Sequence, residues 1–294
     1  MARIGVLGST GMLGSALTRV LSSRNHDVIE FNRNGHSVVG DKVAKELDAT
    51  WSENQLASQI LKSEVDYLVN AIGLIKQVIN EADEESVKLA KQVNAEFPKK
   101  INTFSIANDI PVIQIGTDCV FSGERGHYTE IDEYSPVDLY GRTKVSGELE
   151  SGAAMTIRSS IVGSEIASNN SLLNWVLSQP LNGKVSGYSN HFWNGVTTLA
   201  FAKVVAGVIE NDQFEPGLAH LIPKDFVSKK ELISIMAQAF QREDLVVEDF
   251  PSETPINRTL ATVDSSTNAK FWNLAGYNQI PNIAELIQEF AHWD

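Results

Sequence analysis

A glycine-rich loop between an expected strand and an expected helix limits the N-terminal part of the chain to few folds. The loop is Gly8-Ser9-Thr10-Gly11-Met12-Leu13-Gly14, and it follows the apolar run Arg3–Leu7 directly. Glycines in such a loop permit a tight turn and a close approach of the backbone to a pyrophosphate, while the first N–H groups of the helix face the anion. Because the loop ends a strand and opens a helix, it predicts dinucleotide binding. The residues expected to line the cofactor here are Gly8, Thr10, Gly11, Met12, Leu13 and Gly14.

Short β-branched apolar runs alternate with helical patterns through the first half of the chain, which is typical of a parallel sheet with crossover helices. The expected strands are Arg3–Leu7, Asp27–Phe31, Tyr67–Ala71, Pro111–Ile115 and Ala154–Val162. The expected helices are Met12–Arg24, Glu84–Asn108, Leu139–Glu150, Leu172–Ser178, Val196–Asn211, Lys229–Gln241 and Ile283–His292. This order predicts an α/β fold with two parts. Residues 1–164 would form a Rossmann-type doubly wound parallel sheet, and residues 165–294 mainly a smaller α/β substrate domain, with 196–211 packing back on the first part.

The charge and the residue composition favour a small-molecule substrate. A formal net charge of −13 argues against nucleic acid and anionic membranes as partners, because phosphate binding depends on clustered Lys and Arg. No apolar run is long enough to span a bilayer, and the start of the sequence lacks the pattern of a signal peptide, so a cytoplasmic location is expected. The six histidines form no His-x-x-x-His pair and Cys119 is the single cysteine, so no metal site is expected.

Tyr140 and Lys144 are four residues apart on an expected helix, which places both on one face. Reduction of a carbonyl group needs a proton donor beside its oxygen, and a tyrosine serves when a nearby ammonium lowers its pKa from about 10. Of the six tyrosines, Tyr140 alone has a lysine at this spacing. Upstream, the strand Pro111–Ile115 ends just before Thr117, at the sheet edge where open α/β folds bind ligands. The Thr117 hydroxyl is expected to hold the substrate oxygen against Tyr140.

The glycine loop and this trio together resemble the extended short-chain dehydrogenases/reductases. Glycines 8, 11 and 14 match the family's Gly-x-x-Gly-x-x-Gly loop, and Thr117, Tyr140 and Lys144 match its Ser/Thr, Tyr and Lys in order. The resemblance implies that Asn94 is a fourth active-site residue, which fixes the lysine through a water, and that Tyr140 and Lys144 also contact the cofactor. It also implies a homodimer, and an adenine contact by Asp48. The loop over the cofactor would be Asn70, Ala71, Ile72 and Gly73.

The end of the second expected strand bears on the choice between NADPH and NADH. NAD-selective sites place an acidic residue there for the ribose hydroxyls, whereas NADP sites remove that charge and offer a cation to the 2′-phosphate. Here the strand Asp27–Phe31 ends in Asn32-Arg33, and the guanidinium of Arg33 suits a phosphate. Glu30 is the alternative acid if the strand has another register. NADPH is thus expected to be preferred, with NAD also able to bind.

Two motifs around the trio are most similar to the dTDP-4-dehydrorhamnose reductase family of nucleotide-sugar reductases. They are residues 117–123 (TDCVFSG) and 138–144 (DLYGRTK). The resemblance implies NAD(P)H-dependent reduction of a 4-keto-6-deoxy sugar linked to a nucleoside diphosphate. Cys119 stands where this family usually carries an aromatic residue. The residues expected to contact the substrate are Lys76, Thr117, Asp118, Cys119, Trp193 and Arg258, with Lys184 a further candidate for the diphosphate.

Two other functions stay open on the sequence. A nucleotide-sugar epimerase with bound NAD would use the same trio. The related dehydratases have Asp-Glu after the threonine, whereas here Cys119 follows Asp118, so the missing glutamate argues against dehydration and leaves epimerisation open. A non-catalytic regulatory subunit with a reductase-like fold, such as the β-subunit of methionine adenosyltransferase, is the other alternative. The joint presence of Thr117, Tyr140 and Lys144 disfavours it.

Overall fold

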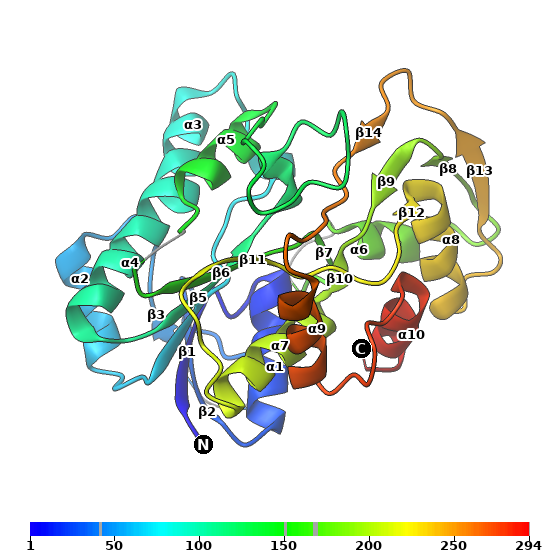
Figure 1. The fold of residues 1–294 in the computed structure, drawn as a ribbon. Helices are drawn as coiled ribbons and strands as arrows, with labels where there is room; N and C mark the ends of the chain where they lie inside the picture. Colours follow the sequence, from blue (N-terminus) through cyan, green and yellow to red (C-terminus); the bar gives the residue numbers. More distant parts are fainter. Residues whose placement is uncertain (41–42, 150–151, 167–169, 294) are drawn as a thin grey trace.

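A seven-stranded parallel sheet forms the centre of the molecule (Figure 1). The computed structural model describes residues 1–40, 43–149, 152–166 and 170–293. The strand order is β11-β6-β5-β4-β1-β2-β3, and the order turns back between β1 and β4, the kind of point at which open α/β sheets bind ligands. This confirms the expected Rossmann-type sheet. Its strands are β1 (Arg3–Leu7), β2 (Asp27–Asn32), β3 (Lys45–Glu46), β4 (Tyr67–Asn70), β5 (Val112–Gly116), β6 (Ala154–Arg158) and β11 (Gly217–His220).

Helices cover both faces of this sheet, as Figure 1 shows. On one face lie α2 (Glu53–Leu61), α3 (Glu84–Lys91), α4 (Phe97–Asn108) and α5 (Leu139–Ser146). On the other lie α1 (Met12–Ser23), α7 (Thr198–Glu210) and α9 (Ser265–Leu274). Neighbouring residues of one strand enter opposite cores: Val69 packs with the core of α1 and α7, and Leu68 with the core of α2 and α4. This alternation follows from the pleat, and it explains why these strands are apolar throughout.

The C-terminal part adds three small sheets beside the large one. The strands β7 (Ile161–Val162) and β10 (Val196–Thr197) pair in parallel, as do β8 (Lys184–Tyr188) and β13 (Val246–Phe250). A third sheet has the order β12-β9-β14. Its strands are β9 (His191–Trp193), β12 (Val227–Ser228) and β14 (Ile256–Asn257). The helices of this part are α6 (Leu172–Leu177), α8 (Lys229–Ala239) and α10 (Ile283–Trp293).

Three expected elements are interrupted in the structure. The long helix expected over Glu84–Asn108 is divided by a π-helical turn, η2 (Gln92–Glu96), and α4 begins with Pro98 in its first turn, where the missing N–H does no harm. The strand expected over Ala154–Val162 is interrupted at Ser159, so that it forms β6 and the short strand β7 (Ile161–Val162). The Ser159 hydroxyl donates to the Ser160 carbonyl, and such local side-chain hydrogen bonds compete with regular strand structure. The helix expected over Leu139–Glu150 ends at Ser146, because Gly147 forms its C-cap; Glu150 lies outside the described residues.

The division of the chain near residue 164 stays a prediction. Beyond that residue, β11 pairs with β6 and completes the large sheet, and α7 packs on α1. The second part therefore pairs with the backbone of β6 and covers apolar side chains of α1 in the first part. Within the described residues, no helix is long and apolar enough to cross a membrane. The same residues hold no group of three or more His, Cys, Asp or Glu side chains placed to bind a metal ion.

Candidate active site

The glycine loop joins β1 to α1 through contacts that exclude larger side chains. Gly8 has a φ of +84°, and a Cβ on Gly14 would lie 2.0 Å from the Gly8 carbonyl oxygen, so the turn requires glycine at both places. No side chain caps α1, whose N-cap is Gly11, so the first N–H groups of the helix are left for a ligand. This cradle suits a pyrophosphate.

The loop after β4 lies against the glycine loop across the turning point of the sheet. The Ala71 N–H donates to the Leu7 carbonyl at 3.0 Å, and a Cβ on Gly8 would lie 2.9 Å from Ile72. Asn70 is buried, with its amide nitrogen on Gln114 and its oxygen on the Ile72 N–H. The structure thus brings the two expected cofactor segments together, while their individual roles stay predictions.

Asn32 braces the protein instead of presenting a free amide to a ribose. Its nitrogen donates to the Ser9 hydroxyl and to the His36 carbonyl, both at 2.8 Å, and its oxygen accepts from the Asn34 N–H. Glu30 is likewise engaged, since its two oxygens accept from Ser37 and from the Val38 N–H. Arg33, in contrast, is exposed, and no described residue pairs with its guanidinium.

Asp48 follows β3 and is half-buried. One of its oxygens accepts both from the N–H and from the hydroxyl of Thr50, at 2.8 and 2.7 Å. No side chain or backbone N–H of the described residues forms a hydrogen bond with the other oxygen. An adenine contact by Asp48 stays a prediction.

Thr117 and Tyr140 meet where β5 ends. Thr117 is buried, accepts from the Cys119 N–H and donates to the Asp118 carboxylate, both at 3.2 Å, and its hydroxyl interacts with that of Tyr140. Tyr140 is in the first turn of α5, whose N-cap Asp138 accepts from the Gly141 N–H at 2.8 Å. Glu81 accepts from the Leu139 N–H at 2.9 Å. Two carboxylates therefore fix the start of the helix that carries Tyr140.

The ionisation of Tyr140 differs from the expectation. Burial raises the pKa of its hydroxyl, and the hydrogen bond with Thr117 only partly opposes this effect. Lys144 donates to the Ile115 carbonyl at 3.3 Å, and burial lowers the pKa of its ammonium. The expected lowering of the Tyr140 pKa by Lys144 is therefore wrong for this arrangement. The hydroxyl stays protonated at neutral pH, which is the form that can donate a proton to a ketone.

Asn94 lies in the π-helical turn, which the sequence pattern did not reveal. Its amide oxygen accepts from the Leu74 N–H at 2.8 Å, and its nitrogen donates to the Leu74 carbonyl and to the Thr143 hydroxyl. A Cβ on Gly147 would lie 1.9 Å from the Asn94 carbonyl, so this turn touches α5 directly. Asn94 thus ties Leu74, which follows the expected cofactor loop, to the helix of Lys144. Turns of the π-helical kind are frequent at functional sites.

Asp118 and Cys119 continue from Thr117 as the 3₁₀ turn η3 (Asp118–Val120). Burial raises the pKa of both groups, that of Cys119 to about 12, so its thiol is no nucleophile at neutral pH. The positive charge of Arg258 acts on both residues, and its guanidinium donates to the Phe121 carbonyl at 2.9 Å. The structure therefore brings Arg258 from the C-terminal part to this site.

The other expected substrate residues already have partners within the protein. Lys76 pairs with Asp138 at 2.8 Å, beside the start of α5. Lys184 is on β8 and pairs with Glu248 on the neighbouring strand β13. Trp193 is 3% exposed, and its N–H donates to the Ser160 hydroxyl. Of the expected substrate residues, Arg258 is the one that joins Thr117, Asp118 and Cys119 from the C-terminal part.

Lys229 was missed by the sequence reasoning. It is the first residue of α8, and its charge acts on Asp118 and Cys119. The helix dipole disfavours a cation in the first turn of a helix. A lysine at this position was therefore the signal in the sequence that could have singled out Lys229.

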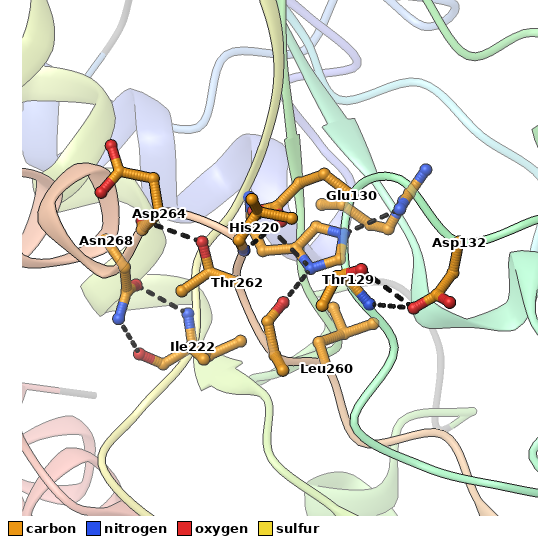
Figure 2. A network of polar contacts seen from close by, with 12 residues as sticks. Thr129, Glu130, Asp132, His220, Ile222, Leu260, Thr262, Asp264 and Asn268 are labelled. Carbon is orange, nitrogen blue, oxygen red and sulfur yellow. Dashed lines mark hydrogen bonds and ion pairs between the residues drawn. The ribbon is translucent and has the colours of Figure 1, made fainter.

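A buried network of charged side chains packs against the end of β5. Arg158 pairs with Glu148 at 2.7 Å, and a Cβ on Gly116 would lie 2.8 Å from that carboxylate. Arg158 also donates to His220 Nε2 at 2.7 Å, so His220 Nδ1 must carry the proton that the Ala261 carbonyl accepts. Figure 2 shows His220 beside Glu130, whose carboxylate accepts from the His220 and Val263 N–H groups.

This network predicts a loss of stability on mild acidification. Burial, together with the charge of Arg158, lowers the pKa of His220 to about 4, whereas an unfolded histidine has a pKa of about 6.5. The unfolded chain therefore binds the extra proton first, and the free energy of unfolding should fall by about 1 to 3 kcal/mol as the pH falls from about 6.5 to 4. His220→Gln should show a smaller fall in denaturant titrations. His292→Gln, at the exposed end of α10, should keep the wild-type slope; equal slopes in all three proteins would contradict the prediction.

Comparison with known proteins agrees with this geometry. The family model of the RmlD substrate binding domain matches residues 2–170, which is more than half of the chain. A protein of Haloferax volcanii named "Probable low-salt glycan biosynthesis reductase Agl14" is 30% identical over 144 residues, covering 49% of this chain and 46% of that protein. The chain thus spans about half the length of that relative.

Two further relatives match over nearly the whole chain. A dTDP-4-dehydrorhamnose reductase of Aggregatibacter actinomycetemcomitans is 24% identical over 279 residues, covering 92% of this chain and 88% of that protein. The crystal structure of the Bacillus anthracis dTDP-4-dehydrorhamnose reductase in complex with NADP is 17% identical, with a TM-score of 0.77 over 99% of this chain and 98% of that one. The chain belongs to the RmlD substrate-binding domain family.

Proposed function

We propose that the protein is an NADPH-dependent reductase of a 4-keto-6-deoxy sugar linked to a nucleoside diphosphate. The observation that carries the proposal is the meeting of Thr117, Tyr140 and Lys144 at the end of β5, beside a glycine cradle suited to a dinucleotide. The names of the relatives support the same reaction. A non-catalytic role would give no reason to keep a protonated tyrosine and a buried lysine at this position.

The residues divide the work of the reaction. When bound along the glycine loop, NADPH supplies the hydride for the keto carbon. Thr117 holds the carbonyl oxygen by a hydrogen bond, and Tyr140 donates its proton to that oxygen as the alcohol forms. Lys144 reaches from α5 to the Ile115 carbonyl at the end of β5, and its ammonium binds the nicotinamide ribose in this proposal. Asn94 fixes the helix that carries Lys144 through Thr143.

A direct assay tests this function. Purified protein is mixed with NADPH and with dTDP-linked or UDP-linked 4-keto-6-deoxy sugars, and the loss of NADPH absorbance and the stereochemistry of the product are measured. We expect oxidation of NADPH with at least one such sugar. A folded protein that binds NADPH but reduces none of them would refute the proposal. An unchanged NADPH level with epimerised sugar would instead identify an epimerase.

The preference for NADPH depends on Arg33 in this proposal. Asn32 is neutral and engaged, Glu30 is held by Ser37 and Val38, and Arg33 is exposed beside the glycine loop. Arg33→Ala should raise the Kd for NADPH about tenfold to 100-fold, the loss expected for a charge-assisted contact to phosphate. The Kd for NADH should stay within about twofold.

Fluorescence titration measures both cofactor constants. Arg24→Ala, which removes an arginine paired with Glu210, is the control and should leave both constants unchanged. A wild-type protein that prefers NADH, or an Arg33 variant that loses both cofactors equally, would refute the role of Arg33. We also propose a homodimer, which the family resemblance implies and sedimentation tests, and a cytoplasmic location, which cell fractionation tests.

A further inference from the structure

Arg158 joins the two segments of the chain that carry Thr117 and Tyr140. It is the last residue of β6 and stands in register with Gly116, the last residue of β5, which precedes Thr117. Its Nε and Nη2 donate to the two oxygens of Glu148, at 3.1 and 2.7 Å. Glu148 lies two residues beyond α5, the helix of Tyr140. The planar guanidinium therefore links the strand before Thr117 to the end of that helix.

The end of β5 also contacts the end of α5 directly. A Cβ on Gly116 would lie 2.8 Å from the Glu148 carboxylate and 3.1 Å from the Arg158 Cα, so this glycine is held between the two. Lys144, one helical turn before Glu148, donates to the Ile115 carbonyl at 3.3 Å. Consecutive residues of β5 thus meet two residues that are one turn apart near the end of α5. The position of this strand end depends on both contacts.

The remaining partners hold the Arg158 side chain in one orientation. Its Nη1 donates to His220 Nε2 at 2.7 Å, and its Nη2 also donates to the Tyr134 hydroxyl at 3.3 Å. Its Cζ lies 5.1 Å from the centre of the Phe121 ring, in the segment that continues from Thr117. Four of its five N–H groups therefore have partners among the described residues, and rotation of the side chain would break several hydrogen bonds at once.

Stability alone does not account for this ion pair. The side chains of Arg158 and Glu148 are 0% and 2% exposed, so both charges have lost their hydration. Apolar side chains of similar volume often stabilise a protein as well as a buried ion pair does, or better. They lack direction, however, whereas a bidentate pair fixes both the distance and the relative plane of its partners. The pair therefore suits a place where geometry matters more than stability.

We propose that Arg158 is a positioning residue for the reduction, which acts through Glu148 to hold Thr117 and Tyr140 at reacting distance. This inference rests on the proposed function, and in it neither Arg158 nor Glu148 touches the substrate. Thr117 and Tyr140 belong to separate elements, so their separation depends on how the end of β5 packs against α5. A displacement of about 1 Å between such groups can lower a rate about 100-fold.

Arg158→Lys tests the role, because it keeps the charge but cannot bind both oxygens of Glu148 in parallel. We expect kcat for keto-sugar reduction to fall about tenfold to 100-fold. KM and the Kd for NADPH should change less than about threefold, since the contacts to both ligands are kept. Arg242→Lys is the matched control. Arg242, beyond the end of α8, forms a bidentate pair with Asp244 at 2.8 and 3.1 Å, and its variant should keep the wild-type kcat.

A further pair of variants separates positioning from stability. Glu148→Met leaves the Arg158 charge buried and unpaired, so its melting temperature should fall strongly. Adding Arg158→Met removes that charge and should restore much of the melting temperature. The kcat of this double variant should nevertheless stay about tenfold to 100-fold below the wild-type value. A double variant that recovers stability and kcat together would overturn the inference, because Arg158 would then serve the fold alone.

A measurement without turnover distinguishes this inference from the proposed reaction. The NMR resonance of a fluorotyrosine incorporated in place of Tyr140 reports the surroundings of that ring. It should shift or broaden in Arg158→Lys and in the double variant, and stay in place in Arg242→Lys. An unmoved resonance in both Arg158 variants overturns the inference. If the resonance moves but the wild type reduces no keto sugar, the link from Arg158 to Tyr140 stands and the proposed reaction falls.

Discussion

Tyr140→Phe should lower kcat for keto-sugar reduction about 100-fold to 10,000-fold, the usual contribution of a general acid. The substitution removes one hydroxyl and keeps the ring, so the packing at the start of α5 is preserved. The Kd for NADPH should therefore change less than about twofold. Steady-state kinetics and fluorescence titration measure the two effects separately.

Tyr67→Phe is the matched control for this experiment. Tyr67 begins β4 and packs against Phe214 at a ring distance of 6.3 Å, away from the glycine loop. Loss of its hydroxyl should leave kcat unchanged. A Tyr140→Phe enzyme with activity within about tenfold of the wild type, a barrier change of only about 1.4 kcal/mol, would remove Tyr140 from the role of proton donor.

Lys144→Ala should damage both chemistry and cofactor binding. The ammonium is anchored on the Ile115 carbonyl at the end of β5, and in the proposed reaction it binds the cofactor ribose. We expect kcat/KM to fall on the order of 100-fold or more and the Kd for NADPH to rise about tenfold, as for loss of a charged hydrogen bond. Lys100→Ala is the control, because Lys100 makes a similar contact with the Trp51 carbonyl outside the site.

The pH profile gives a second measure of Lys144. Burial lowers its pKa below the ordinary lysine value of 10.5, so the ammonium loses its proton at a lower pH than a free lysine does. Affinity for NADPH should accordingly decrease on the alkaline side before pH 10.5, and this decrease should vanish in Lys144→Ala. A variant with normal cofactor affinity would contradict the double role of the lysine.

The nucleotide-binding part of the fold could be predicted because its signals are local. The glycine loop needs only β1 and α1, which are adjacent in the sequence, and Thr117 and Tyr140 each lie at the end of an element with a clear pattern. The turn η2 escaped prediction, since nothing in a helical pattern marks where one extra residue enters a turn. The short strands escaped as well: β14 owes its conformation to β9, far away in the sequence.

Side-chain partners were the least predictable feature of the site. The sequence shows that Asn32, Lys76 and Trp193 are the right types of residue for ribose, phosphate and sugar. It does not show that Ser9, Asp138 and Ser160 already occupy their polar groups. Lys229 illustrates the converse, because its place beside the Trp193 ring becomes visible only once segments distant in the sequence are brought together.

The late addition of β11 to the large sheet sets an order for folding on the ribosome. While residues 1–164 emerge, the edge of β6 lacks its partner, and Leu17 and Leu21 of α1 lack the cover that α7 later provides. Such a nascent chain exposes an unpaired strand edge and an apolar helix face, the features that promote aggregation. The large sheet cannot be completed before residue 220, the last residue of β11, has left the exit tunnel. A gene fragment that encodes only the first 164 residues should therefore yield insoluble protein.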